Sequence, residues 1–241
     1  MPTSSGASGS ANQLLAALPE EEWALLEPGM ERVPLVFRQV LQEVEQPVTH
    51  LWFPCSGVGS MVSTMEDGAV VEVATIGREG MIGLSEVLGA ERLAQSVLVQ
   101  VPGEGLGLPV ERHRALSAQL PVLGRMLLRY AAGMVTQIAQ GSACNRLHDI
   151  EARCARWLLI THDRVDGDRF HLTHEFLAQM LGVTRPSVTI AAGILQKAGL
   201  ISYNRGEIEI LDRPRLEEAS CECYRIITDE FRHLLKEGGT A

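Results

Sequence analysis

Arg185 occupies the first position of a predicted helix, in the stretch TRPSVT that begins at Thr184. A cation at a helix amino end opposes the helix dipole at a cost of about 0.3–1 kcal/mol, so a purely structural helix would favour an acid there. If this helix end faces a phosphate or a guanine edge, the main-chain amides and the guanidinium converge on one acceptor-rich target. Arg185 is therefore the leading candidate for a nucleic-acid contact. A solvated arginine without such a role is the alternative.

Hydroxyl side chains and a second arginine accompany Arg185 in the same part of the chain. Hydroxyl groups bind phosphate oxygens or base edges, and arginine binds either. The predicted DNA contacts are, together with Arg185, the residues Thr173, Thr184, Ser187, Thr189 and Arg205.

The elements that must position these residues are two short helices and a hairpin. Thr173 can cap a first helix, and Gly182 supplies the left-handed residue that ends it. Thr184 can cap a second helix over residues 185–197, where a proline in the first turn is tolerated. Alternating apolar residues over 201–210 then predict a β-hairpin with Arg205 at its tip. Helix, turn, helix and hairpin in this order predict a winged helix-turn-helix.

A long helix is predicted upstream, over residues 121–147. Its apolar positions recur at spacings of four and three along its whole length, which is typical of a helix that pairs with another helix. We interpret this stripe as a self-association seam, with packing on the chain's own barrel as the alternative. The predicted seam residues are Leu123, Leu127, Tyr130, Met134 and Ile138.

Short runs rich in Val, Ile and Thr occupy residues 33–109, separated by turn signals such as Asp67-Gly68. Strands at this spacing predict an antiparallel sandwich or jelly-roll barrel. The fold class is therefore α+β, with a β-barrel, a long dimerisation helix and a winged helix-turn-helix. The predicted divisions are a disordered lead-in at 1–12, a sensory barrel at 13–120, the dimerisation helix at 121–147 and the DNA-binding domain with a C-terminal helix at 148–241.

The charge distribution distinguishes the C-terminal part of the chain from the rest. The formal net charge is −9, which by itself disfavours a polyanionic partner. Residues 149–215 hold nine basic and nine acidic residues, so the imbalance lies elsewhere. This pattern is expected if only one part of the molecule approaches nucleic acid.

The five cysteines are Cys55, Cys144, Cys154, Cys221 and Cys223. They are too scattered for a disulfide framework, which favours the reducing cytoplasm as the location. No uninterrupted apolar stretch approaches 18 residues, so neither a membrane span nor a membrane partner is expected. Cys221 and Cys223 lack a second ligand pair nearby in the sequence, so inert thiols are favoured over a metal site.

The motifs resemble those of the cyclic-AMP-receptor/fumarate-nitrate-regulator (Crp/Fnr) family of bacterial transcription factors. LTHEFLAQMLGVTRPSV is similar to that family's helix-turn-helix signature, and AGLISYNRGEIEILD is similar to its wing. The resemblance runs from about Leu14 to Leu216. It implies a cyclic-nucleotide-binding-like barrel and a homodimer that reads a near-palindromic operator, with half-sites about 34 Å apart.

Departures from the family pattern concern the effector. Cyclic-nucleotide members carry Gly-Glu-Leu and Arg-Ser/Thr stretches in the barrel, whereas here Leu84 follows Gly83 and Gln95 precedes Ser96. Uncharged Gln95 cannot pair with a cyclic phosphate, although Arg92 could substitute. Cyclic AMP is therefore not expected, and the effector is unknown. The corresponding effector-pocket residues are Gly83, Leu84, Ser85, Gln95 and Ser96.

The resemblance also bears on metal groups, operator and partners. The cysteine cluster of iron–sulfur members is missing and Cys55 alone cannot hold a cluster, so none is expected. Pro186 and Ile190 stand at two base-reading positions of the family, so an operator other than its familiar consensus is expected. The expected partners are double-stranded operator DNA, a second copy of the chain, RNA polymerase and a small-molecule effector, if one exists.

Two other classes of protein remain as alternatives. The winged helix could bind a protein instead of DNA, and a C-terminal helix over residues 215–237, expected to pack on the wing domain, could present a partner surface. A jelly roll could also belong to a cupin-like metalloenzyme, which needs clustered histidine and carboxylate ligands. Residues 33–109 contain a single histidine, His50, so no enzymatic activity is expected.

Overall fold

The computed structural model describes residues 11–90 and 92–236. The predicted lead-in lies outside these residues except at its end, where the prediction is wrong. Asn12 is buried, caps α1 (Gln13–Ala16) and donates hydrogen bonds from Nδ2 to the carbonyl oxygens of Pro54 and Gly80 at 2.8 and 2.9 Å. The ordered N-terminal domain therefore already includes Asn12.

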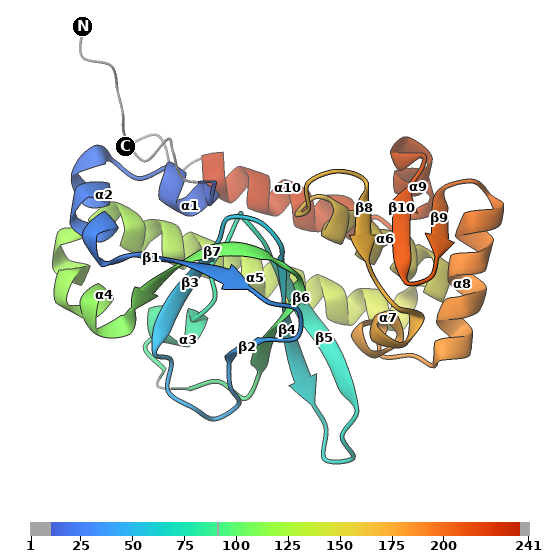
Figure 1. Cartoon of the computed structure of the whole chain (residues 1–241), viewed down its shortest axis with the longest axis horizontal. Coiled ribbons are helices and arrows are strands. Elements are labelled where there is room, and N and C mark those ends of the chain that lie inside the picture. Colours follow the sequence, from blue (N-terminus) through green and yellow to red (C-terminus); the bar gives the residue numbers. More distant parts are fainter. Residues whose placement is uncertain (1–10, 91, 237–241) are drawn as a thin grey trace, which may run out of the picture.

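Two antiparallel sheets form the N-terminal barrel (Figure 1). Their strand orders are β1-β7-β3 and β2-β6-β4-β5. The strands are β1 (Glu31–Leu35), β2 (Val40–Gln42), β3 (His50–Pro54), β4 (Val58–Thr64), β5 (Val70–Ile76), β6 (Ser96–Val101) and β7 (Gly103–Pro109). Gly68 has a φ of 82° in the tight β4–β5 turn, as the Asp-Gly pair predicts. The α+β fold with an antiparallel barrel is thus confirmed.

Further helices precede, interrupt and follow the strands of the barrel along the chain. They are α2 (Glu20–Leu26), α3 (Leu84–Val87), α4 (Val110–Leu116) and α5 (Pro121–Leu147). The last strand of the barrel, β7, ends at Pro109, and Val110 begins α4. The α5 helix crosses the molecule from α4 to the C-terminal domain (Figure 1).

The C-terminal domain is a winged helix-turn-helix. Its elements are α6 (Ile150–His162), β8 (Arg169–His171), α7 (His174–Leu181), α8 (Arg185–Lys197), β9 (Ile201–Asn204) and β10 (Glu207–Ile210). The hairpin of β9 and β10 carries β8 on its other edge, in the order β8-β10-β9. The sequence did not predict β8, because its three residues follow an acidic, glycine-containing segment and are too few to show alternation.

The predicted seam on α5 is largely buried within a single chain. Leu123, Leu127, Tyr130 and Met134 are each at most 3% exposed, and only Ile138, at 37%, remains open. The four buried residues belong to the hydrophobic core of the barrel. The seam prediction is wrong at these four positions, because helical spacing identifies an apolar stripe without saying what covers it. A second stripe at the same spacing is exposed: Leu128, Ala132, Val135, Ala139 and Ser142.

The C-terminal segment forms two helices, α9 (Arg213–Ala219) and α10 (Cys223–Lys236). The expected packing of this segment on the wing domain is wrong for α10, which lies along α5 (Figure 1). Ile227 and Phe231 join the barrel core. Gly133 of α5 allows this approach, because a Cβ there would lie 2.8 Å from the Phe231 ring. The chain thus returns from the DNA-binding domain to the barrel.

Direct contacts also join the barrel to the winged helix. Arg164 pairs with Glu79 at 2.8 Å, and both side chains are nearly buried. Gln100 donates to the hydroxyl of Thr161 at 3.1 Å. The two domains therefore share a polar and buried contact surface. In the described part of the chain, no helix has the length and apolar character needed to span a membrane.

Candidate nucleic-acid interface

The turn between α7 and α8 has the geometry that its residues predict. The Thr173 hydroxyl accepts a hydrogen bond from the Phe176 amide at 3.1 Å, which caps α7. Gly182 has a φ of 63°, a left-handed conformation that glycine adopts without steric cost. Thr184 caps α8 by accepting from the Ser187 amide at 3.4 Å, and the two hydroxyls lie 2.9 Å apart. These caps fix the direction in which α8 leaves the turn.

Arg185 lies exposed at the amino end of α8. Within residues 11–90 and 92–236, its guanidinium forms no ion pair and donates no hydrogen bond. Burial, and then the charge of Arg185, lower the pKa of the neighbouring His174. The guanidinium of Arg185 is therefore available to a ligand at the amino end of α8, as the nucleic-acid hypothesis requires.

The wing places a second exposed cation near the same face. Arg205 and Gly206 form the two-residue turn between β9 and β10, with φ values of 51° and 85°. Positive φ at both positions is the geometry of a type I′ turn, which suits the twist of a hairpin. Arg205 is exposed at this tip.

The remaining basic residues of the segment 149–215 are already neutralised or buried. Four form ion pairs with acids of this chain: Arg164, Arg169, Arg213 and Arg215. Two are buried in α6: Arg153 and Arg156. Among the described residues of this segment, the exposed cations outside ion pairs are Arg185, Lys197 and Arg205. Sequence reasoning missed Lys197, which ends α8.

The outer face of α8 is partly apolar, a feature that sequence reasoning also missed. Ile190 and Ile194 are 62% and 48% exposed. These two residues lie on the face of α8 opposite its buried residues. Thr189, a predicted DNA contact, already forms hydrogen bonds within the domain. Its hydroxyl donates to the Arg185 carbonyl and lies 3.0 Å from Nδ1 of His174.

The predicted effector-pocket residues lie around α3 and the start of β6. Gly83 precedes α3 with a φ of 110°, and Leu84 and Ser85 are buried. Gln95 is half-buried, and Ser96, also half-buried, begins β6.

Arginines near this segment are paired with carboxylates. Arg92, the alternative phosphate ligand, lies 2.9 Å from Glu45. Arg114 lies 2.7 Å from Glu86, and this hydrogen-bonded pairing lowers the pKa of Glu86. A phosphate at either guanidinium would therefore compete with its carboxylate partner.

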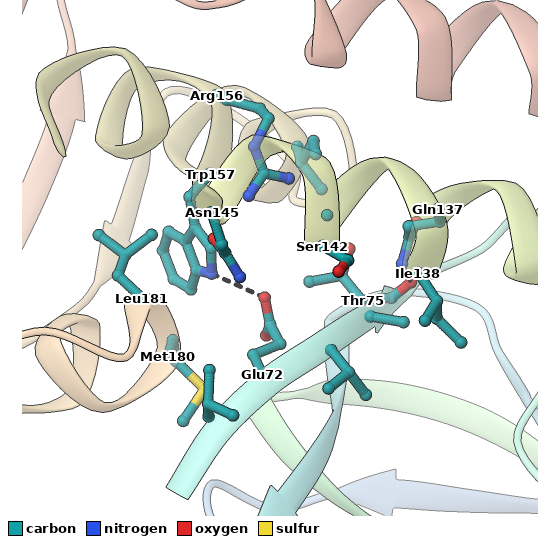
Figure 2. A pocket seen from close by; sticks show the side chains of 15 residues that line it. Glu72, Thr75, Gln137, Ile138, Ser142, Asn145, Arg156, Trp157, Met180 and Leu181 are labelled. Carbon is teal, nitrogen blue, oxygen red and sulfur yellow. Dashed lines mark hydrogen bonds between the residues drawn. The ribbon is translucent and has the colours of Figure 1, made fainter. Parts of the chain in front are cut away.

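A cavity of about 300 Å³ lies elsewhere, between the barrel and the DNA-binding domain (Figure 2). It is bounded by β5, α5, α6 and α7. Glu72 of β5 accepts a hydrogen bond from the indole of Trp157 at 2.8 Å. Burial raises the pKa of Glu72 to about 7, against the opposing effect of hydrogen bonds from Ser60 and Trp157. None of the predicted effector-pocket residues lines this cavity.

An exposed helix end after a tight helical turn, beside a wing with a cation at its tip, defines the class of winged-helix DNA-binding proteins. A family model, the Crp-like helix-turn-helix domain, matches residues 152–219. The chain is thus a DNA-binding transcriptional regulator, and its predicted resemblance to the Crp/Fnr family is confirmed.

Relatives and solved structures share this architecture. The global nitrogen regulator of Synechocystis is 22% identical over 173 residues, which cover 68% of this chain and 77% of that protein. The structure of FixK2 from Bradyrhizobium japonicum matches with a TM-score of 0.68 at 14% identity, over 80% of this chain and 98% of that one. A CRP-family regulator from Thermus thermophilus matches with a TM-score of 0.65 at 19% identity, over 78% and 96%.

Proposed function

We propose that this protein is a homodimeric, sequence-specific regulator that binds one α8 helix of each subunit in successive major grooves of an operator. The observation that carries the proposal is the outward-facing amino end of α8, where Arg185 has no ion-pair partner among the described residues. A DNA-binding function requires the compartment that holds the genome, which supports the predicted cytoplasmic location.

The chemistry of α8 specifies how a half-site is read. Arg185 can form a bidentate pair with guanine O6 and N7. Ile190 and Ile194 offer apolar surface that suits the methyl group of thymine. Lys197 and Arg205, near the ends of the interface, contact phosphates and set the position of the protein. We therefore expect a half-site with one guanine and at least one thymine in fixed register.

Dimerisation is proposed to use the exposed stripe on α5, defined above from Leu128 to Ser142. Leu128 and Val135 are 58% and 66% exposed, which is unusual for two aliphatic side chains on one helix face. Ala132 between them and Ala139 one turn beyond Val135 are small, which allows two helices to approach closely. The stripe has the period of a coiled-coil seam and supports a pair of α5 helices around a twofold axis.

Effector sensing, where the barrel retains it, is proposed for the cavity beside Glu72. Its walls come from both domains, so a ligand bound there would alter how the barrel contacts α6 and α7. This placement supports coupling between the sensory barrel and the DNA-binding domain. A barrel that serves only as a structural platform is the alternative, and contact with RNA polymerase is a further proposal drawn from the family resemblance.

Regulation rather than catalysis is the proposed activity. In the barrel, His50 stacks on Trp52 with ring centroids 4.9 Å apart, and its Nδ1 lies 3.0 Å from the hydroxyl of Thr49. These contacts give His50 a packing role and do not support the cupin-like alternative. The protein-interaction alternative is addressed by the experiment below.

Selection of duplexes from a random pool by the full-length protein tests the proposal. We expect enriched sites with twofold symmetry and half-site centres about 10 base pairs apart. Binding through 6–10 phosphates would weaken by about 10³–10⁵-fold between 50 and 200 mM salt. If no duplex sequence is enriched and the residual DNA binding does not depend on salt, the result would instead support the protein-interaction module.

A further inference from the structure

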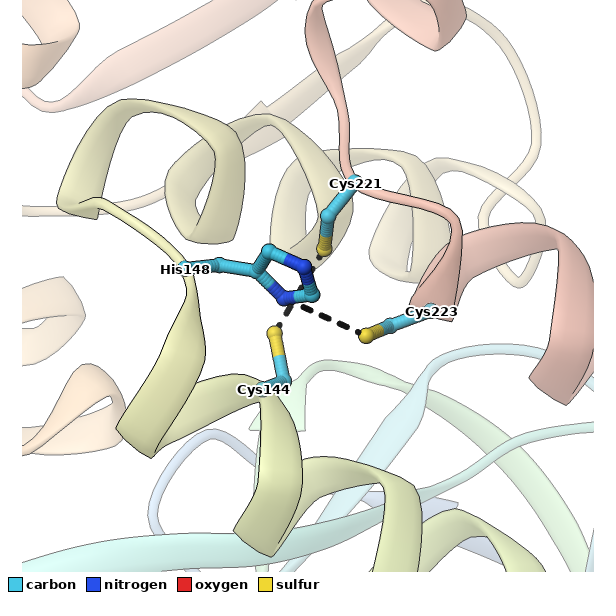
Figure 3. A group of neighbouring side chains, drawn as sticks. All are labelled: Cys144, His148, Cys221 and Cys223. Carbon is cyan, nitrogen blue, oxygen red and sulfur yellow. Dashed lines mark hydrogen bonds between the residues drawn. The ribbon is translucent and has the colours of Figure 1, made fainter.

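Four metal-binding side chains meet at the junction of α5, α6 and α10 (Figure 3). Cys144 and His148 come from the last turn of α5 and the residue that ends it. Cys223 is the first residue of α10, and Cys221 lies in the connection just before it, 77 residues from Cys144 in the chain. All three cysteines are buried and His148 is half-buried. We propose that these side chains form a four-coordinate Zn²⁺ site.

The distances fit a single metal ion. The ligand atoms all lie within 4.8 Å of one another, with Cys144 Sγ 3.5 Å from Cys221 Sγ and Cys223 Sγ 3.5 Å from His148 Nδ1. Zn–S bonds of about 2.3 Å and Zn–N bonds of about 2.0 Å in a tetrahedron place sulfur atoms about 3.8 Å apart, and sulfur and nitrogen about 3.5 Å apart. The two short contacts therefore match edges of a zinc-sized tetrahedron, and the remaining ligand atoms lie close enough to reach its other corners by small side-chain rotations.

The orientation of His148 is that of a metal ligand. Its Nδ1 faces the sulfur atoms, while its Nε2 lies 3.3 Å from the carboxylate of Glu222. A carboxylate on the far nitrogen fixes the imidazole ring and its tautomer and strengthens the near nitrogen as a donor. Glu222 stands between the two cysteine ligands in the sequence and so comes with them.

Positive charge beside the cluster suits bound thiolates. Three thiolates with one divalent cation carry a net charge of −1. Arg153 and Arg156 of α6 are buried beside the cluster, and the Nε atom of each has no hydrogen-bond partner among the described residues. Electrostatic interactions link Arg153 to Cys144 and Cys221, and Arg156 to Cys144. A buried guanidinium needs an anionic neighbour, which the metal thiolate centre supplies.

Soft sulfur ligands and one imidazole favour Zn²⁺ over hard cations such as Mg²⁺. Four protein ligands close the coordination sphere, which is the arrangement of structural zinc sites rather than catalytic ones. Bound metal would fasten the start of α10 to the end of α5, where the chain enters the DNA-binding domain. The site would thereby hold the winged helix and the barrel in one arrangement.

Metal analysis of the purified full-length protein tests the proposal, with cells grown in zinc-supplemented medium and chelators left out. We expect about one zinc per chain for the wild type. Co²⁺ replacing it should give the strong visible absorption of tetrahedral cobalt thiolate. C144S and C223S should lose most of the zinc, whereas the matched control C55S, a buried cysteine of the barrel, should retain it.

A wild-type measurement keeps the test decisive if C144S or C223S does not fold. Titration with a thiol-specific mercurial should release the zinc in step with modification of three thiols. Three results would overturn the proposal: wild type that neither carries zinc nor takes up Co²⁺, a Cys144–Cys221 disulfide in freshly purified protein, or iron with acid-labile sulfide in place of zinc.

Discussion

The arginines of the winged helix and those near the predicted effector pocket are used in opposite ways. On the DNA-binding domain, Arg185 and Arg205 are exposed and have no ion-pair partner among the described residues. Near the barrel segment, Arg92 and Arg114 lie 2.9 and 2.7 Å from carboxylates of Glu45 and Glu86. Arg185 and Arg205 are thus more available to an anion than the two arginines near the predicted effector pocket.

This difference explains how a chain with a net charge of −9 can bind a polyanion. Affinity for DNA depends on local cations that release counterions, and not on the sum over the chain. At Arg92 and Arg114, a cyclic phosphate would have to compete with the carboxylates of Glu45 and Glu86. The predictions below test the two halves of this comparison.

The largest effect is expected from V135E in the exposed stripe of α5. A charge at this position would oppose pairing of two helices, and the loss of one half-site should weaken operator binding by about 100-fold or more. Sedimentation velocity would follow the dimer, and fluorescence anisotropy would follow operator binding. The matched control is L147E, another exposed aliphatic position of α5 outside the stripe. Equal behaviour of V135E and L147E would contradict the proposed seam.

R185A should weaken the specific complex by about 1–3 kcal/mol, because one bidentate guanine contact is lost. The thermal midpoint should not change, since Arg185 is exposed. Mobility-shift titration against the selected operator and a guanine-substituted operator would measure the effect. The matched control R92A removes a barrel arginine and should leave DNA affinity unchanged. A comparable loss in both variants would show that overall charge governs binding.

The winged helix could be predicted from sequence in detail because its signals are local. The caps at Thr173 and Thr184, the left-handed Gly182 and the hairpin tip at Arg205 are each specified by a residue and its close neighbours. Only the three-residue β8 was missed. Local signals also predicted that Arg185 would lie exposed at a helix end.

Long-range packing could not be predicted in the same way. The α5 stripe through Leu127 and Tyr130 has the period of a helix seam, but the barrel and α10 cover it. The cluster joins Cys144 and His148 to Cys221 and Cys223, two pairs of residues that lie far apart in the sequence. In both cases the sequence shows side chains that must pack against other residues, and only the folded structure shows which residues these are.

Glu72 connects the cavity to pH. Burial raises its pKa to about 7, so the folded state holds a proton that the unfolded state releases near the ordinary carboxyl pKa. Its contribution to stability should therefore fall as pH rises through the range from about 4.5 to 7. The full shift corresponds to about 3 kcal/mol, and partial exposure to the cavity makes about 1–2 kcal/mol the expected change.

E72Q should remove this pH dependence while keeping an acceptor for Trp157. Urea unfolding at several pH values would compare E72Q with wild type and with E86Q, whose parent carboxyl has a lowered pKa. The wild-type free energy of unfolding should decrease relative to E72Q on raising the pH from 5 to 8. Parallel pH profiles for the two proteins would contradict the assigned role of Glu72.

The smallest effect is expected from R205A at the tip of the wing. A phosphate contact carries no sequence information, so affinity should fall by under about 1 kcal/mol for every duplex alike, and the salt slope should fall by about 1. Anisotropy titrations over a salt series, with operator and scrambled DNA, would separate this pattern from the sequence-dependent loss in R185A. A specificity change in R205A would instead show that the wing reads bases. The winged helix would then use Arg185 and Arg205, its two exposed arginines outside ion pairs in the described part of the chain, for readout, whereas Arg92 and Arg114 remain paired with carboxylates of the barrel domain.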